Sequence, residues 1–162
     1  MKRHFFAAPL AATLLLSTLG CSKKDEPATP TTNSNYKLDN TTTTCQATAA
    51  LTKASSGGIS IDYLTIDLIT TPQPTTGMQM LHLYFVKPNT QGNTTYTLRE
   101  IMYMPTSSSV PYYFSVDAAT LTTTSNGGFS GTFAGKIINS SGSPAAPFST
   151  ITGGTFTNVR PQ

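Results

Sequence analysis

The chain has 162 residues, of which 10% are charged, and its formal net charge is +3. From Pro27 onward, six basic side chains stand against five acidic ones. This balance excludes the basic footprint of a nucleic-acid-binding protein and gives no electrostatic attraction to anionic lipid. Threonine is abundant and charge is low, a composition that favours β-strands and differs from that of disordered chains.

The chain begins with a leader of the secretory type. Residues 2–4 are basic, residues 5–19 form an apolar run with few interruptions, and Gly20 precedes Cys21. A basic head, an apolar segment and a small residue before the cleavage point are typical of a signal peptide. The apolar run is shorter than the roughly 20 residues of a spanning helix, which favours a cleaved signal over a transmembrane anchor.

The residues around Cys21 carry a family resemblance. Leu19-Gly20-Cys21 resembles the lipobox of bacterial lipoproteins, with Thr18 where that family usually has Leu or Val. The resemblance implies that residues 1–20 are removed and that the Cys21 thiol is acylated, so that membrane lipid becomes a partner of the protein. Two or three acyl chains on one residue give lasting attachment, since a single chain binds only marginally.

Cys45 is the second of the two cysteines in the chain. If Cys21 is lipidated, Cys45 has no partner within the chain and is expected to be a small, buried thiol. The alternative is an ordinary signal peptide with an incidental Cys21, which an oxidising compartment could join to Cys45. The state of Cys45 therefore distinguishes two interpretations of the leader.

A charged and then polar stretch follows the cysteine. In the stretch SKKDE, Ser22 is not the Asp that favours inner-membrane retention in lipoproteins of many Gram-negative bacteria, so the resemblance implies the outer membrane. The run KKDE resembles the export signal of Bacteroidota lipoproteins, which implies that the protein faces the cell exterior. Residues 26–35 are rich in Pro, Thr and Asn without apolar periodicity, which predicts a flexible spacer. We therefore expect a signal peptide over 1–20, lipidated Cys21 and a linker over 21–35, and one domain over 36–162.

The body of the chain has the pattern of an all-β domain. Short apolar runs alternate with clusters of Gly, Pro, Asn and Ser, and no long segment has helical periodicity. This spacing predicts a single antiparallel β-sandwich of about eight strands. The expected strands cover residues 43–53, 59–70, 78–87, 94–104, 112–117, 120–124, 129–139 and 148–159.

Alternation assigns some strand faces. Apolar residues before Leu64 occupy one parity and those from Leu64 onward occupy the other, so we expect a bulge near Tyr63 or a central strand covered on both faces. Phe129, Phe133 and Ile137 share one face, with glycines between them that allow neighbouring groups to approach closely.

The last third carries a second resemblance. The stretches GGFSGTFAGKI and STITGGTFTNV, together with the earlier GNTTYTL, resemble strands of small Bacteroidota lipoproteins of unknown function. The resemblance covers residues 36–159 and implies a small antiparallel, sandwich-like domain. It carries over no catalytic residues.

The ionisable residues do not form a recognisable catalytic group. His82 is the only histidine left once the leader is removed, so a histidine cluster for a metal is excluded. Asp62 and Asp67 lie five residues apart, on opposite faces of one strand, which argues against a paired-acid site. We expect no catalytic residue, no metal and no cofactor. A hydrolase would need a cleft that unites His82 with Asp62 or Asp117.

Tyr103, Tyr112 and Tyr113 flank the loop MPTSSSVP and are the candidate ligand contacts. Tyrosines on loops stack on sugars or anchor proteins, although these three could instead cap one end of the domain. The leading hypothesis is a lipid-anchored, non-enzymatic surface module of the outer membrane with a binding or structural role. The alternative is an accessory lipoprotein that captures a glycan or a protein through this loop.

Overall fold

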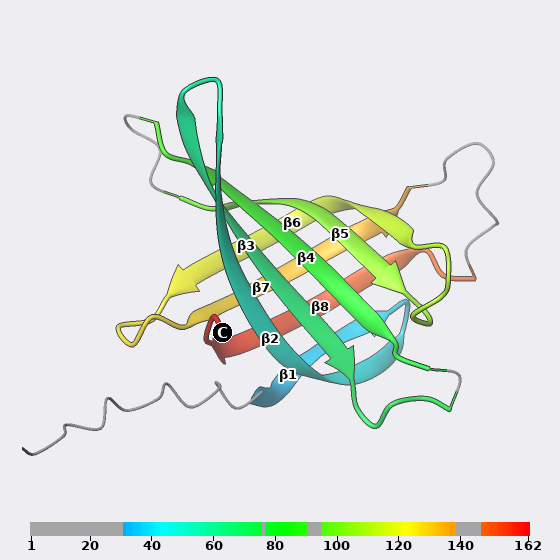
Figure 1. Cartoon of the computed structure of the whole chain (residues 1–162). Helices are drawn as coiled ribbons and strands as arrows, with labels where there is room; N and C mark the ends of the chain where they lie inside the picture. Colours follow the sequence, from blue (N-terminus) through cyan, green and yellow to red (C-terminus); the bar gives the residue numbers. More distant parts are fainter. Residues whose placement is uncertain (1–30, 76, 91–94, 139–146) are drawn as a thin grey trace, which may run out of the picture.

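In a computed structural model that describes residues 31–75, 77–90, 95–138 and 147–162, eight antiparallel strands form one closed barrel (Figure 1). Each strand pairs with its neighbours in chain order, and the first strand pairs with the last. The predicted all-β class and the eight antiparallel strands are confirmed. The strands are β1 (Thr31–Leu38), β2 (Thr41–Ser56), β3 (Ile59–Thr70), β4 (Met80–Pro88), β5 (Thr97–Met104), β6 (Tyr112–Thr123), β7 (Phe129–Ile137) and β8 (Thr150–Val159).

The expected sandwich is wrong, because the sheet closes on itself instead of stacking as two sheets. Closure depends on β1, which pairs with β2 on one side and with β8 on the other. This strand begins at Thr31, inside the stretch 21–35 that the sequence predicts as linker. Strands alternate with the same period in a sandwich and in a barrel, so local pattern does not separate the two folds.

Two expectations about individual strands are also corrected. Residues 112–117 and 120–124 belong to one strand, β6, whose register shifts around Asp117. β3 pairs with both neighbours without a register shift, so the bulge expected near Tyr63 is absent. The apolar side chains that precede Leu64 therefore lie on the outer surface of the barrel.

The barrel interior is filled by alternate side chains of every strand. On β3, Leu64, Ile66 and Leu68 are fully buried, whereas Tyr63 and Asp67 lie on the outer face. Large rings meet across the interior, as where Phe85 packs edge-on against Phe156 with ring centroids 6.3 Å apart. The core consists of Tyr36, Cys45, Ala47, Ala49, Leu64, Ile66, Leu68, Leu81, Leu83, Phe85, Leu98, Ile101, Tyr103, Phe114, Phe129, Phe133, Ile151, Phe156 and Val159.

Glycines make room for these rings. The predicted alignment of Phe129, Phe133 and Ile137 on one face of β7 is confirmed, and that face points inward. A Cβ added to Gly131, between the two phenylalanines, would lie 2.7 Å from Cζ of Phe156. Glycine therefore lets the neighbouring ring approach the backbone, as expected from its place in the strand.

The barrel has two different ends. The end that carries the β2–β3, β4–β5 and β6–β7 connections is called the charged end here, because Asp62 and Lys87 lie in it. The opposite end is called the aromatic end, because Phe148 closes it together with three other rings. At the charged end, Gly57 and Gly58 both have positive φ, at 58° and 78°. This pair suits the tight mirror-image turn that joins β2 to β3.

A carboxylate ties the two strands of the closing seam together at the aromatic end. Asp39, in the turn between β1 and β2, accepts hydrogen bonds from the backbone N–H and the hydroxyl of Ser149, both at 3.0 Å. It also accepts the N–H of Thr150 at 2.9 Å and its hydroxyl at 3.1 Å. These donors, the backbone N–H groups first, lower the pKa of Asp39. The carboxylate thereby fixes the start of β8 beside the end of β1.

Strand pairing between the described residues is shorter at the charged end for two pairs of strands. Among the described residues, β5 and β6 pair only through residues 101–103 and 112–114. The pairing of β1 with β2 likewise ends at Ala47, beyond which Pro161 forms a bridge with Ala49. Among the described residues, β6 beyond Phe114 and β2 beyond Ala49 therefore have a paired strand on one side only.

Candidate functional site

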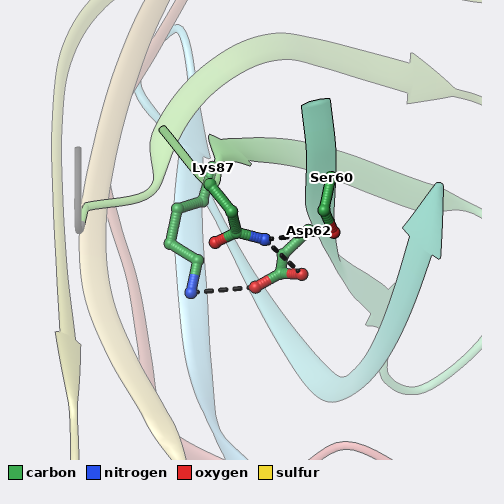
Figure 2. Close-up of polar contacts among 4 residues, drawn as sticks. Ser60, Asp62 and Lys87 are labelled. Carbon is green, nitrogen blue, oxygen red and sulfur yellow. Dashed lines mark hydrogen bonds and ion pairs between the residues drawn. The ribbon is translucent and has the colours of Figure 1, made fainter. Parts of the chain in front are cut away.

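The charged end contains an ion pair that points into the barrel mouth (Figure 2). Asp62 of β3 is 8% exposed, and its Oδ2 lies 2.9 Å from Nζ of Lys87 on the adjacent strand β4. The other carboxylate oxygen accepts a hydrogen bond of 3.0 Å from the Asn89 amide, which also donates to the Ser60 hydroxyl at 3.5 Å. Lys87 lies over the ring of Tyr96, 5.0 Å from its centroid.

These contacts fix the charge state of the pair. Hydrogen bonds from Lys87 and then Asn89 lower the pKa of Asp62, while the hydrogen bond to Asp62 raises the pKa of Lys87. Burial raises the pKa of Tyr96. At neutral pH the site is thus a carboxylate and an ammonium that neutralise each other. Such a pair can hold the barrel mouth in place, but it offers neither a free base nor a free acid.

A second pair of ionisable side chains, an aspartate and a histidine, lies on the outer surface of the same strands. Asp67 Oδ1 is 2.6 Å from Nδ1 of His82, which stands opposite it on β4. The His82 ring stacks on Tyr84 at 6.5 Å, and Tyr84 stacks on Tyr63 at 5.5 Å. The prediction that Asp62 and Asp67 occupy opposite faces is confirmed, since the former points inward and the latter outward.

The outer surface of the barrel differs from one side to the other. Over β3–β5 it carries aromatic, methionine and branched apolar side chains of intermediate exposure, together with the polar side chains of Thr65, Asp67, His82 and Glu100. Over β7 and β8 it carries mostly hydroxyl side chains. The outward positions include Ile61, Tyr63, Ile69, Met80, Tyr84, Val86, Met102 and Met104 on the first side, and Ser130, Thr132, Thr152, Thr155 and Thr157 on the second.

The three candidate ligand tyrosines do not form one surface. Tyr103 is 3% exposed and packs edge-on against Phe148 at 5.2 Å, and the Gln79 amide donates a hydrogen bond to its hydroxyl. Tyr112 packs on the same ring at 5.0 Å. Only Tyr113 is exposed, at 42%, on the outer wall. Tyr103 and Tyr112 therefore close the aromatic end of the barrel, which agrees with their capping interpretation.

Cys45 is a fully buried free thiol among the described residues. Burial raises its pKa to about 12, so the reactive thiolate is scarce at neutral pH. Burial also raises the pKa of the neighbouring Tyr36 hydroxyl. Cys21, the other cysteine, lies outside the described residues, as do the leader, the SKKDE stretch and residues 27–30 of the expected linker.

The structure does not unite the residues that a hydrolase would need. His82 lies on the outer face and Asp62 on the inner face, while Asp117 of β6 pairs with Lys136 at 3.5 Å. Within the described ranges, no group of three or more His, Cys, Asp or Glu side chains could hold a metal ion. The same part of the chain contains no helix that could span a membrane.

Sequence reasoning missed the partners of Asp62, although one signal for them was present. Lys87 has the parity of Leu81, Leu83 and Phe85, which all point inward on β4. Strict alternation would have placed its side chain inside the barrel.

Comparisons with protein-family models, with curated proteins and with solved structures gave no match for this chain.

Proposed function

We propose that this chain is a lipid-anchored, non-catalytic module of the outer membrane, displayed on the cell exterior. Acylated Cys21 holds the bilayer, and the barrel that begins at Thr31 is the displayed part. The proposal takes its anchor from the lipobox resemblance at Leu19-Gly20-Cys21. Ten residues from Cys21 to Thr31 reach at most about 35 Å, which keeps the barrel near the membrane surface.

The observation that carries the non-catalytic role is the placement of the charged side chains. Asp62 is neutralised by Lys87 inside the barrel, and Asp67 is paired with His82 outside it. The sheet lies between the two pairs, and a packed apolar core occupies the interior. Catalysis would instead require an acid, a base and a nucleophile that converge on one substrate position. The arrangement supports a rigid scaffold that presents a surface.

Intact-mass spectrometry of the protein extracted from its own cells tests the anchor. We expect a chain that starts at Cys21, carries at least a diacylglycerol, fractionates with membranes and is cut by protease added to whole cells. The Cys21→Ser variant should lose the acyl mass and the membrane association, while the matched Cys45→Ser variant should keep both. A soluble protein with an unmodified Cys21 thiol would contradict the proposal.

The non-catalytic role has its own test. The purified protein is assayed against esters, peptides, glycosides and phosphoesters, with Asp62→Asn and His82→Ala variants in parallel. We expect no turnover above the buffer rate. Turnover by the native protein that either substitution abolishes would overturn this part of the proposal.

A second candidate role, capture of a protein partner, is favoured by the outer wall of β3–β5. The stack of Tyr63, Tyr84 and His82 lies among methionines, and tyrosine and methionine are enriched in the cores of protein interfaces. We expect Tyr84→Ala to lose captured protein in a pull-down, while Thr132→Ala on the opposite wall keeps it. Equal capture by both variants would remove this role, and glycan-array binding lost in Tyr84→Ala would assign the wall to sugars instead.

A further inference from the structure

We propose that the outer wall of β4 and β5 is a binding site for one soft, monovalent metal ion, copper(I). The ligands are the thioether sulfurs of Met80, Met102 and Met104 and one ring nitrogen of His82. The site goes beyond the surface role proposed above and does not depend on the lipid anchor. The sequence-based expectation of no metal rested on the lack of a histidine cluster, which thioether ligands do not require.

The methionines of the chain are concentrated in two short stretches. Of the five, one is Met1, and the other four lie in MQMLH, residues 78–82, and in MYM, residues 102–104. β4 and β5 are neighbours in the barrel and bring these two stretches together as antiparallel partners (Figure 1). Residues that are far apart in the sequence thus form one patch.

The four proposed ligands share one face of the sheet. Met80 stands directly opposite Met104, and His82 stands directly opposite Met102. The residues between them on both strands are buried in the core, so these four lie on the outer face, with intermediate exposure. Directly opposite residues have Cβ atoms about 4.5–5.5 Å apart, and the three rotatable bonds of methionine allow the sulfurs to converge on one ion.

The histidine is held in the orientation that metal binding requires. Nδ1 of His82 lies 2.6 Å from Oδ1 of Asp67 on β3. Because a carboxylate accepts, we assign the proton to Nδ1, which leaves the lone pair of the neutral imidazole on Nε2. β3 and β5 flank β4 on opposite sides, so Asp67 holds the ring from the side away from Met102. Metal-binding histidines commonly donate their other N–H to a carboxylate in this way.

The kind of ligand selects the metal. Thioethers are soft, neutral ligands that favour copper(I), whereas zinc is bound by thiolates, imidazoles and carboxylates. Glu100 lies two residues from Met102 on the same face of β5, so negative charge near the site favours a cation. Methionine also serves as a flexible apolar cover, but such a cover does not account for an imidazole held by a carboxylate in its midst.

Competition with a chelator tests the site. The full-length protein, extracted from its own cells in mild detergent, is titrated with copper(I) and ascorbate under argon against bathocuproine disulfonate, whose absorbance reports the copper that it keeps. We expect the wild type to withdraw copper(I) from the chelator. Asp67→Ala, which releases the imidazole, should weaken binding about 10-fold, and Met102→Leu and His82→Ala, which remove ligands, should weaken it by more.

Ile69→Leu is the matched control. Ile69 stands opposite Met80 on the same wall but has no sulfur, and leucine nearly conserves the volume of both isoleucine and methionine. This variant should bind copper(I) as the wild type does. A thiol elsewhere in the chain would bind equally in every variant, so the differences among variants report on the wall.

Three outcomes of this titration would overturn the proposal. The first is a wild-type protein that withdraws no copper(I) from the chelator. The second is a Met102→Leu protein that withdraws as much as the wild type. The third is an Ile69→Leu protein that binds as weakly as Met102→Leu, because the loss would then come from altered packing of the wall.

Silver(I), an air-stable soft ion of the same charge, gives a second measurement. With methionine methyl groups labelled with carbon-13, the first equivalent of silver(I) should shift the NMR signals of Met80, Met102 and Met104 together. Zinc(II) should leave the same signals in place. Signals that do not move with silver(I), or that move equally with zinc(II), would contradict a soft-metal site.

Discussion

Replacing Gly154 with alanine tests how tightly the barrel core is packed. A Cβ at this position of β8 would lie 2.5 Å from Cε2 and 2.6 Å from Cε1 of Phe133, and closer still to Cζ. Optimal contact between carbon atoms is about 3.5–4.0 Å, so the ring would have to retreat by roughly 1 Å within a close-packed interior. Overpacking of this kind costs about 1–3 kcal/mol. Without the collision, alanine in a strand would stabilise by about 0.5–1 kcal/mol.

Urea unfolding followed by far-ultraviolet circular dichroism measures the effect, since the chain has no tryptophan for fluorescence. We expect Gly154→Ala to lower the free energy of unfolding by about 1–3 kcal/mol. Phe133→Leu alone also destabilises, because it leaves a cavity. It removes the ring that collides, however, so the double variant should be about 1 kcal/mol more stable than the sum of the single effects predicts.

The neighbouring glycine provides the control. Gly153 has a positive φ of 59°, and a Cβ added there meets no atom within 4 Å. Gly153→Ala should therefore destabilise through backbone conformation alone and add independently to Phe133→Leu. A Gly154→Ala protein as stable as the wild type, or one whose effect simply adds to that of Phe133→Leu, would refute the reasoning.

Three further predictions concern ionisable groups. Lys87→Met removes the main cause of the lowered pKa of Asp62, so the free energy of unfolding at pH 7 should fall by about 1–3 kcal/mol. The difference in stability between Lys87→Met and the wild type is present above about pH 3.9, the pKa of Asp62 in the unfolded chain, and should disappear as Asp62 is protonated at lower pH. Equal urea midpoints of the two proteins at pH 7 would contradict this prediction. The lowered pKa of Asp39 gives stability that is lost as the pH falls through the pKa of the folded state, so Asp39→Asn should reduce the loss of stability at acid pH. Amide hydrogen exchange at Thr150 should also accelerate, and an unchanged pH dependence would contradict the role of Asp39 in holding β8. Cys45 should resist iodoacetamide at pH 8 in the native protein and react fully in urea, whereas fast native labelling would mean that its surroundings open readily.

The sequence predicts much of this fold, because the barrel follows local alternation. The inward rows of β3 and β7 follow from the spacing of their apolar residues and from the glycines beside Phe133. The strand β1 does not follow from the local pattern, because its sequence TTNSNYKL has only Tyr36 and Leu38 as apolar residues. It pairs with β2 on one side and, on the other, with β8, which lies more than 100 residues away, and such context overrides local propensity.

The ion pair of Asp62 and Lys87 was less predictable than the strands, because it too depends on contacts between separate strands. A Lys–Asp pair inside a barrel mouth depends on two strands placed in register, which brings Asp62 opposite Lys87. The tyrosine prediction treated positions near a loop as exposed, but Tyr103 has the inward parity of Ile101 and lies in the core. Parity decides which side chains reach solvent, and the position of the loop does not.

The contact between Asn35 and Thr155 has a consequence for biosynthesis. The strand made first must wait for the strand made last, so the ring cannot close while the polypeptide is still being synthesised. For a chain exported as proposed above, the barrel would therefore close only after β8 has also been translocated.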